Sequence, residues 1–237
     1  PTTGRAGGYW DLDNVRLTES LPLPAVPVFI PNSSFESPET VFVDVNTAPW
    51  QKGSTPAWYD EGGGYAWSQL TGVFPNVPPE DPAHIDNCDG KQAVWLFALP
   101  EVELYQDLEA TFEVGRCYEL AVGVIGGGGN MRDNVPLEIR LYYRDAQDAR
   151  VTIESTSFVY RTADGYIKHL NDVRLALPAV RETDPWAGKH IGVQIISTLT
   201  LADLDPTTGR AGGYWDLDNV RLTQSLPPDD PAATDGD

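Results

Sequence analysis

Short apolar runs rich in β-branched and aromatic residues recur along the chain, and glycine, proline and aspartate separate them. No segment between the runs has the periodicity of an amphipathic helix. The runs predict strands over residues 28–30, 93–99, 102–108, 117–125, 137–143, 151–159, 173–177, 191–199 and 214–222. Strands at this spacing predict an all-β fold, an antiparallel two-sheet jelly-roll β-sandwich.

The last predicted strand changes parity in its middle. Trp215 and Leu217 share one face, whereas Val220 and Leu222 fall on the other, so a regular strand would expose one apolar pair. A β-bulge near residues 218–219 resolves the conflict because it adds one residue. The bulge directs a carboxylate inward beside a buried tryptophan, where it needs a partner.

One segment of the sequence is written twice. Residues 1–18 recur letter for letter as residues 206–223, a period of 205 residues (206 − 1). The repeat predicts that the chain is a fragment of a tandem array. An overlap introduced at the chain boundary would produce the same duplicated sequence. The domains expected are a closing strand and linker from a preceding repeat over 1–22, a sandwich over 23–226 and an acidic, proline-rich tail over 227–237.

Two near-identical copies of a closing strand can fill the same place in a sandwich. This is the condition for strand donation between subunits, so neighbouring copies of the chain are predicted partners in a head-to-tail homopolymer. The residues expected to carry this assembly are Tyr9, Trp10, Leu12, Asp13, Val15 and Leu17.

The chain is strongly acidic. It has 16 basic and 35 acidic residues and a net charge of −19, which disfavours nucleic acid and anionic membrane surfaces as partners and favours cations, calcium above all. Solubility or a saline habitat would explain the same acidity. No run of about 18 apolar residues exists, so no membrane insertion is expected.

The two cysteines, Cys88 and Cys117, predict one disulfide in an exported protein. Two buried, unreactive thiols are the alternative. We therefore expect an extracellular protein, secreted or on the cell surface.

Catalytic motifs are scarce. The three histidines are scattered, and Gly126–Gly129 lacks the lysine and hydroxyl residue of a phosphate loop, so these glycines predict a flexible hairpin turn. Glu101 and Glu103 fall on one exposed strand face, which disfavours a catalytic pair. The sequence therefore predicts no enzyme. A small-molecule cyclase would need a deep aromatic pocket with a poised acid, which the sequence does not show.

Three landmarks resemble a known family. The segments IPNSSFESP, DGKQAVWL and YWDLDNVRL occur in the order found in calcium-containing carbohydrate-binding-module jelly rolls of the family 4, 9 and 22 type, within the galactose-binding-like superfamily, and the resemblance covers most of residues 26–223. It implies a structural calcium ion with the ligands Ser34, Glu36, Asp89 and Asp218. The alternative is that Glu36 and Asp218 are solvated or capped by backbone amides.

The resemblance also implies glycan binding by aromatic rings in loops. The candidate ligand contacts are Trp50, Trp58, Tyr59 and Tyr65. We expect Trp67 and Trp95 to be packing residues. A face formed by Tyr142, Tyr143 and Arg144 is a second possible site.

These observations predict a non-catalytic, calcium-stabilised extracellular β-sandwich repeat that acts as a structural and adhesive unit of a surface or filament protein and binds glycans. The alternative is a discrete carbohydrate-binding module of a secreted polysaccharide-degrading enzyme.

Overall fold

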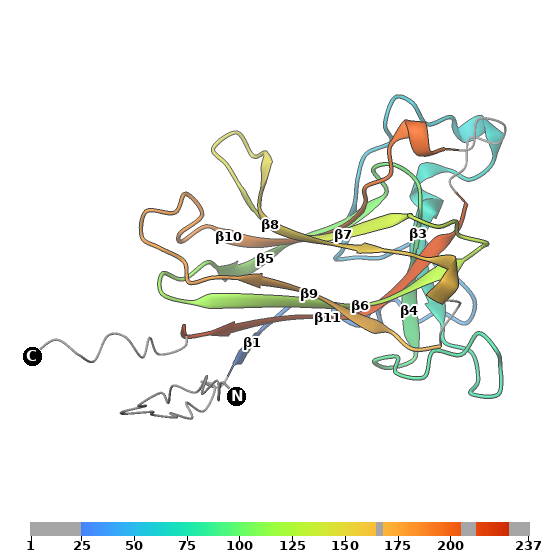
Figure 1. Ribbon diagram of the computed structural model, residues 1–237, viewed down its shortest axis with the longest axis horizontal. Coiled ribbons are helices and arrows are strands. Elements are labelled where there is room, and N and C mark those ends of the chain that lie inside the picture. Colours follow the sequence, from blue (N-terminus) through green and yellow to red (C-terminus); the bar gives the residue numbers. More distant parts are fainter. Residues whose placement is uncertain (1–24, 165–167, 205–211, 228–237) are drawn as a thin grey trace, which may run out of the picture.

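The computed structural model describes residues 25–164, 168–204 and 212–227. Its strands form two antiparallel sheets that pack face to face (Figure 1). The predicted all-β jelly-roll sandwich is therefore confirmed. No helix in these ranges is long and apolar enough to cross a membrane.

The first layer is a six-stranded sheet in the order β3-β4-β11-β6-β9, with β1 beside the second half of β11. Its strands are β1 (Val26–Val28), β3 (Thr71–Pro75), β4 (Gln92–Phe97), β6 (Cys117–Gly128), β9 (Asn171–Leu177) and β11 (Tyr214–Ser225). The strand β11 lies in the middle of this layer, and its first half pairs with both β4 and β6.

The second layer is a five-stranded sheet in the order β2-β5-β10-β7-β8. Its strands are β2 (Gln51–Lys52), β5 (Glu103–Thr111), β7 (Pro136–Arg144), β8 (Arg150–Val159) and β10 (His190–Ser197). The described residues also contain the short 3-10 helices η1 (Glu61–Gly63), η2 (Trp67–Leu70), η3 (Thr162–Asp164) and η4 (Leu201–Asp203).

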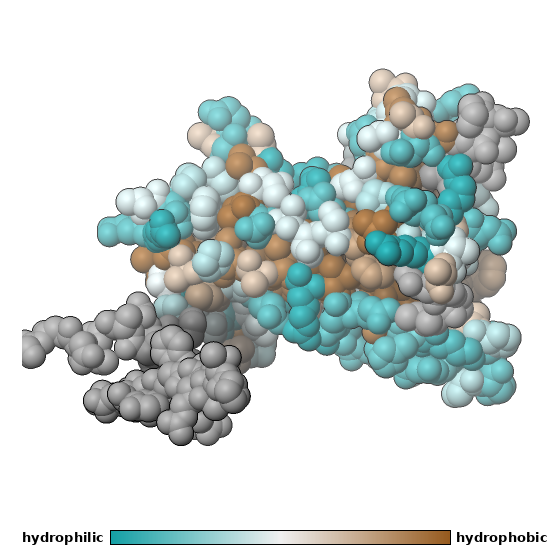
Figure 2. Space-filling view, viewed as in Figure 1, coloured by the Kyte–Doolittle hydropathy of each residue, from teal (hydrophilic) through white to brown (hydrophobic). Residues whose placement is uncertain are grey.

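The main hydrophobic core lies between the two sheets. Trp215 on β11 is fully buried there and meets the rings of Phe158 on β8 and Tyr160 just after it. Figure 2 shows the same arrangement from outside, with hydrophobic residues gathered in a band through the middle of the molecule. Burial of this apolar area from both sheets is the main stabilising contribution to the fold.

A second, smaller hydrophobic cluster lies on the opposite face of the six-stranded sheet. It contains Ile85, Ala93, Ile125 and Leu170, and it is separate from the main core. Ala93 and Ile125 point to this face because side chains alternate along a strand. Residues 76–90 form a loop over this face, and the Asn76 side chain closes the loop through two hydrogen bonds of 2.9 Å with the backbone of Ile85.

The predicted bulge in the last strand is confirmed. The register of β11 against β6 shifts between Asp218 and Arg221, and Asn219 has a φ of 54°. Trp215 and Leu217 before the bulge and Val220 after it are all buried. The extra residue restores the inward direction of the apolar side chains, as the parity change required.

Two predictions about local structure need correction. Residues 44–90 contain β2 and β3 as well as two 3-10 helices, although no strand is predicted there. Gly126, predicted in a hairpin turn, lies within β6. A Cβ atom on Gly126 would lie 2.7 Å from the Trp215 ring, so this glycine permits close packing of an aromatic side chain.

Candidate active site

An open cavity of about 840 Å³ lies on the outer face of the six-stranded sheet, where β3, β4, β11 and β6 run side by side. Tyr65, Phe74, Trp95, Phe97 and Tyr214 supply aromatic walls. The Phe97 ring centroid lies 5.5 Å from that of Tyr65 and 6.0 Å from that of Tyr214. The cavity is thus an aromatic site outside the main core.

Asp216 lies on the floor of this cavity. Its neighbours across the sheet are Trp95 on β4 and Ile125 on β6, so apolar side chains flank the carboxyl on both sides. Asp216 is 5% exposed, and its Oδ1 atom has no hydrogen-bond partner among the described residues. Burial without a partner raises the pKa of Asp216 to about 7, because the charged form loses its hydration.

The loop before β2 forms one wall of the cavity. Val43 and Val45 line it, and a backbone bridge between Asp44 and Val73 joins this loop to β3. The Lys52 ammonium donates hydrogen bonds of 2.5 Å to the Val45 carbonyl oxygen and 2.6 Å to the Thr71 carbonyl oxygen. Lys52 therefore fixes this wall against the edge of the sheet.

Two glycines let the aromatic rings lie flat on the neighbouring strands. A Cβ atom on Gly72 would lie 2.3 Å from the Trp95 ring, and one on Gly128 would lie 2.4 Å from the Tyr214 ring. The rings therefore occupy the space of the missing side chains, and the cavity stays open above Asp216.

This arrangement can donate a proton from a carboxyl group that is almost completely buried. A carboxyl group with a pKa near neutrality is still partly protonated at the pH where it works, which suits a general acid. Aromatic faces stabilise a nearby positive charge through the ring quadrupole. The site thus combines a proton source with surroundings that favour a cation.

The predicted calcium ligands Glu36, Asp89 and Asp218 lie near one another. Each of the three carboxylates raises the pKa of the Cys88 thiol, an effect that adds to the burial of that thiol. Asp218 is fully buried and accepts 2.6 Å hydrogen bonds from the backbone N–H groups of Asp89 and Asn219. Burial raises the pKa of Asp218 to about 7.

Backbone amides also cap the predicted calcium ligand Glu36. The Glu36 Oε1 atom accepts 2.8 Å hydrogen bonds from the N–H groups of Lys91 and Gln92. This is the amide capping that the sequence left open as an alternative. Within residues 25–164, 168–204 and 212–227, no group of three or more His, Cys, Asp or Glu side chains is placed to hold a metal ion. Calcium binding therefore stays a prediction.

Thermal unfolding with and without EDTA tests that prediction. If calcium binds the folded chain between Glu36 and Asp218, EDTA removes a ligand of the native state and lowers the Tm by several degrees. Added calcium restores the Tm, whereas added magnesium does not. Equal Tm values in calcium and in EDTA would contradict the prediction.

The predicted disulfide is wrong. Both Cys88 and Cys117 are free. Cys88 lies beside Asp218, which pairs with Gly123, whereas Cys117 is at the start of β6. Six residues of strand correspond to about 20 Å, far more than the roughly 7 Å between Cα atoms that a disulfide tolerates. The two thiols are unlinked, as in the alternative, but both are half-buried rather than buried.

The four aromatic residues predicted to contact ligand lie in different places. Trp50 is 3% exposed and packs on Phe35 in the main core. Trp58 and Tyr59 pack edge-on against Trp67, and neither is among the residues that line the cavity. Tyr65 is 51% exposed and lines the cavity. Trp95, expected to be only a packing residue, lines the cavity as well.

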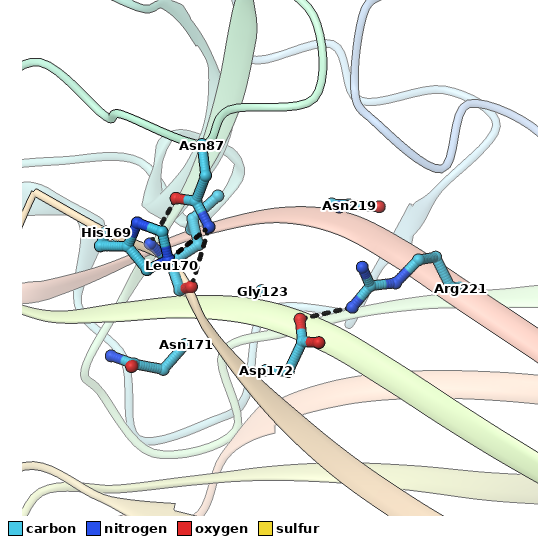
Figure 3. Close-up of a pocket in the computed structure, with 8 residues that line it drawn as sticks. All are labelled: Asn87, Gly123, His169, Leu170, Asn171, Asp172, Asn219 and Arg221. Atoms are coloured by element: carbon cyan, nitrogen blue, oxygen red, sulfur yellow. Dashed lines mark hydrogen bonds and ion pairs between the residues drawn. The ribbon is translucent and has the colours of Figure 1, made fainter.

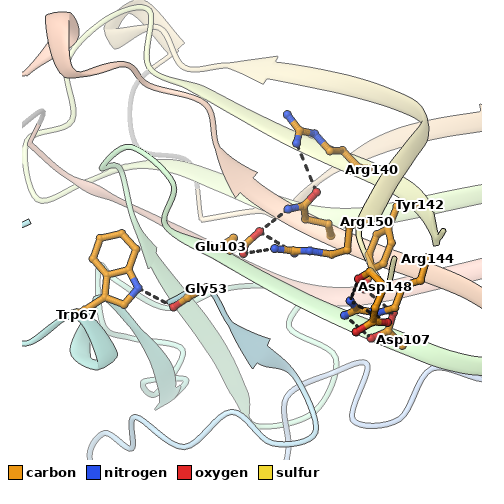
Figure 4. Close-up of polar contacts among 10 residues, drawn as sticks. Gly53, Trp67, Glu103, Asp107, Arg140, Tyr142, Arg144, Asp148 and Arg150 are labelled. Carbon is orange, nitrogen blue, oxygen red and sulfur yellow. Dashed lines mark hydrogen bonds and ion pairs between the residues drawn. The ribbon is translucent and has the colours of Figure 1, made fainter. Parts of the chain in front are cut away.

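The second predicted face lies on the five-stranded sheet. Tyr142 is fully buried and donates a 3.0 Å hydrogen bond to Asp107, which also accepts two 3.0 Å hydrogen bonds from Arg144 (Figure 4). Tyr143 points to the opposite side of β7 because side chains alternate. Tyr142 and Arg144 therefore already hold each other in place through Asp107.

A polar pocket of about 290 Å³ lies further along the outer face of the six-stranded sheet (Figure 3). Asn87 exchanges two hydrogen bonds, of 3.0 and 2.7 Å, with the backbone of Leu170 at its side. Arg221 forms an ion pair with Asp172 across its floor. These contacts tie a loop to the sheet, and the pocket is much smaller than the aromatic cavity.

The residues predicted to carry assembly, 9–17, lie outside the described residues, so strand donation has no structural account. Asp216 was not among the residues predicted from the sequence. The available signal was the parity of the last strand, which places Tyr214, Asp216 and Asp218 together on the face opposite Trp215.

The fold and the site together define an antiparallel jelly-roll protein with a small-molecule cavity that contains a buried acid. The chain belongs to the HpiC1-like family, described as HpiC1 cyclase, whose model matches residues 26–223. No curated protein matches this chain.

Solved structures share the fold. The Stig cyclase Fisc from Fischerella sp. TAU, in complex with (3Z)-3-(1-methyl-2-pyrrolidinylidene)-3H-indole, is 20% identical, with a TM-score of 0.59 over 86% of this chain and 100% of that chain. The apo form of a cyclase from Fischerella sp. is 20% identical, with a TM-score of 0.60 over 86% and 98%. The xylan-binding CBM22-1 domain of Paenibacillus barcinonensis Xyn10C is 11% identical, with a TM-score of 0.45 over 89% and 100%.

The family match overturns the predicted function. The prediction of a non-catalytic structural and adhesive repeat of a surface or filament protein is wrong, because the family is one of cyclases. The prediction that the protein is not an enzyme is wrong for the same reason. The tandem-array interpretation of the duplicated segment was part of that function and is not supported. The jelly-roll sandwich that the resemblance to carbohydrate-binding modules implied is the fold observed, but the family is that of the cyclases.

Proposed function

We propose that this protein closes a ring in an aromatic small molecule by protonating an alkene. The observation that supports this most directly is the position of Asp216, a buried carboxyl without a partner for Oδ1 on the floor of an aromatic cavity. Membership of a cyclase family agrees with it. Glycan recognition, the other predicted ligand chemistry, stays a prediction.

The reaction needs one proton and no other reagent. Asp216 gives its carboxyl proton to one alkene carbon, and the electron pair of the double bond forms the new C–H bond. The other alkene carbon becomes a cation, and an electron pair of the aromatic ring attacks it to form a C–C bond. The aromatic ring that formed the new C–C bond then loses a proton to the Asp216 carboxylate. Substrate and product therefore have the same composition.

The walls contribute by stabilising the cation. The faces of Trp95, Phe97 and Tyr214 lower the energy of the positively charged intermediate, by about 0.5 to 2 kcal/mol for each well-placed ring. A filled aromatic cavity also excludes water, which would otherwise capture the cation as an alcohol. Its volume of about 840 Å³ lies in the usual range for sites that bind small molecules.

An indole alkene is a suitable probe, because the Fischerella cyclase was solved with an indole compound. In 3-(4-methylpent-3-enyl)indole, protonation of the double bond gives a tertiary cation within reach of indole C2. Ring closure then gives 1,1-dimethyl-2,3,4,9-tetrahydro-1H-carbazole.

In D₂O we expect this product to carry one deuterium at the carbon that was the alkene CH, since the exchanged carboxyl of Asp216 supplies a deuteron. Mass spectrometry and NMR locate the label. Buffer without protein and heat-denatured protein are the controls, because free acid could also protonate the alkene. Absence of ring closure, or closure without deuterium, would overturn the proposed function.

A further inference from the structure

The charges around the aromatic cavity are one-sided. Two carboxyl residues line it: Asp81, in the loop that forms the rim, is negatively charged, and Asp216 on the floor holds the proton of the proposed reaction. None of the described residues that line the cavity is a lysine, arginine or histidine. A site of this kind repels an anion and attracts a cation, and the net charge of −19 acts in the same direction.

Asp81 is held at the rim by its own loop. Its Oδ1 atom accepts a 2.8 Å hydrogen bond from the Ala83 N–H group, and its backbone N–H donates a 2.9 Å hydrogen bond to the Pro78 carbonyl oxygen. Lys168, a base close to this loop, donates a 2.6 Å hydrogen bond to the Asp81 carbonyl oxygen. The Asp81 carboxylate forms no ion pair with Lys168, so its charge remains available to a ligand.

The aromatic walls favour the same charge. Trp95 is fixed by a 3.2 Å hydrogen bond from its Nε1 to the Gln69 carbonyl oxygen, and its ring lies 6.4 Å from that of Phe74. Tyr65, half exposed at the rim, offers its ring next to the entrance. Ring faces attract ammonium groups, and an adjacent carboxylate adds to that attraction.

We propose that the cavity takes aromatic compounds that carry a protonated amine, with the aromatic part against Trp95 and Phe97 and the ammonium group at Asp81. This assignment rests on the proposed function in one respect, since it concerns the same cavity. It adds the class of compound that enters that cavity. The amine at the rim and the alkene at the floor would then lie at opposite ends of the ligand. The cation at the rim stays away from the carbon that Asp216 protonates.

Three indoles of similar size and different charge test the assignment. Tryptamine is a cation at pH 7, tryptophol is neutral and indole-3-acetate is an anion. By isothermal titration calorimetry we expect tryptamine to bind about tenfold more tightly than tryptophol, and indole-3-acetate not to bind measurably. Equal binding of tryptamine and indole-3-acetate, or no binding of any of the three, would overturn the assignment.

The Asp81→Asn variant separates the rim carboxylate from the rest of the site. Asparagine keeps an Oδ1 atom for the Ala83 N–H group, so the loop is preserved while the charge is lost. We expect tryptamine affinity to fall about five- to tenfold and tryptophol affinity to stay unchanged. Glu182→Gln is the matched control, since it removes one exposed negative charge beyond the far end of β6. An equal loss for both ligands, or an equal loss in the control, would contradict the role of Asp81.

These measurements detect binding without turnover. Charge-selective binding with no deuterated product would overturn the cyclisation and leave the ligand class standing. Ring closure with no preference for tryptamine would overturn the ligand class and leave the cyclisation standing.

Discussion

Replacing Asp216 with asparagine is expected to reduce ring closure of the indole alkene by about 10² to 10⁴-fold, the usual contribution of a positioned general acid. Asparagine has nearly the same shape and cannot donate a carboxyl proton. Binding of tryptophol should change little, because the aromatic walls remain. Initial rates and calorimetry measure the two effects separately.

The same variant is expected to be more stable than the wild type at pH 8. The folded-state pKa of Asp216, about 7, exceeds the ordinary aspartate pKa of 3.8, so its contribution to stability is present below pH 3.8 and is lost as pH rises to about 7. Asp216→Asn does not ionise and avoids that loss, which is roughly 4 kcal/mol at most. At pH 4 the two proteins should unfold at the same urea concentration.

Asp148→Asn is the control for both measurements. Asp148 lies on the exposed hairpin between β7 and β8, where its side chain is 84% exposed. It should leave both turnover and the pH dependence of stability unchanged. If Asp216→Asn kept full turnover, or lost as much stability as the wild type between pH 4 and pH 8, Asp216 would not be a buried acid that donates a proton.

Arg150→Met, on the five-stranded sheet, is expected to lower the free energy of unfolding strongly. The Arg150 guanidinium forms hydrogen bonds of 2.7 and 2.9 Å with the two carboxylate oxygens of Glu103, which is 6% exposed (Figure 4). The centre of the guanidinium lies 4.0 Å from the Tyr105 ring centroid. Without Arg150, the Glu103 carboxylate is buried, and among the residues that the structure describes the Gln194 amide is the one side-chain donor left to it. Such a change costs about 3 to 5 kcal/mol.

Urea unfolding followed by circular dichroism measures this cost. Arg174→Met is the matched control, because Arg174 is 55% exposed and its pairs with Glu119 and Asp172 are open to solvent. An exposed pair contributes less than about 1 kcal/mol. Adding Glu103→Gln to Arg150→Met should recover most of the loss. Equal losses for the two arginine variants would show that the Glu103 pair is no more important than a surface pair.

The strands of the sandwich could be predicted because their residues are β-branched or aromatic and their turns contain glycine, proline or aspartate. The two strands that were missed, β2 and β3, are short, and β3 ends in a proline. They form through pairing with β5 and β4, which are distant in the sequence. Local composition does not specify such pairings.

The site was harder to predict because it depends on which strands are neighbours. The bulge at Asp218 was predicted correctly, but the carboxylate expected to turn inward beside the buried tryptophan lies on the opposite face of the strand from Trp215. The sequence did not show that Trp95 pairs with Asp216 or that residues 76–90 cover this face of the sheet. In the sequence, Asp216 was therefore one of several polar residues in a strand, with nothing to set it apart as a cavity acid beside a tryptophan.

The small cluster of Ile85, Ala93, Ile125 and Leu170 stands apart from the main core. Because the two clusters do not share residues, a lineage could exchange the loop around Ile85 without repacking the interior between the sheets. New substrates could then be acquired by swapping rim sequences on an unchanged sandwich, with Asp216 retained as the acid. Grafting residues 76–90 from one family member onto another is a direct route to altered product spectra.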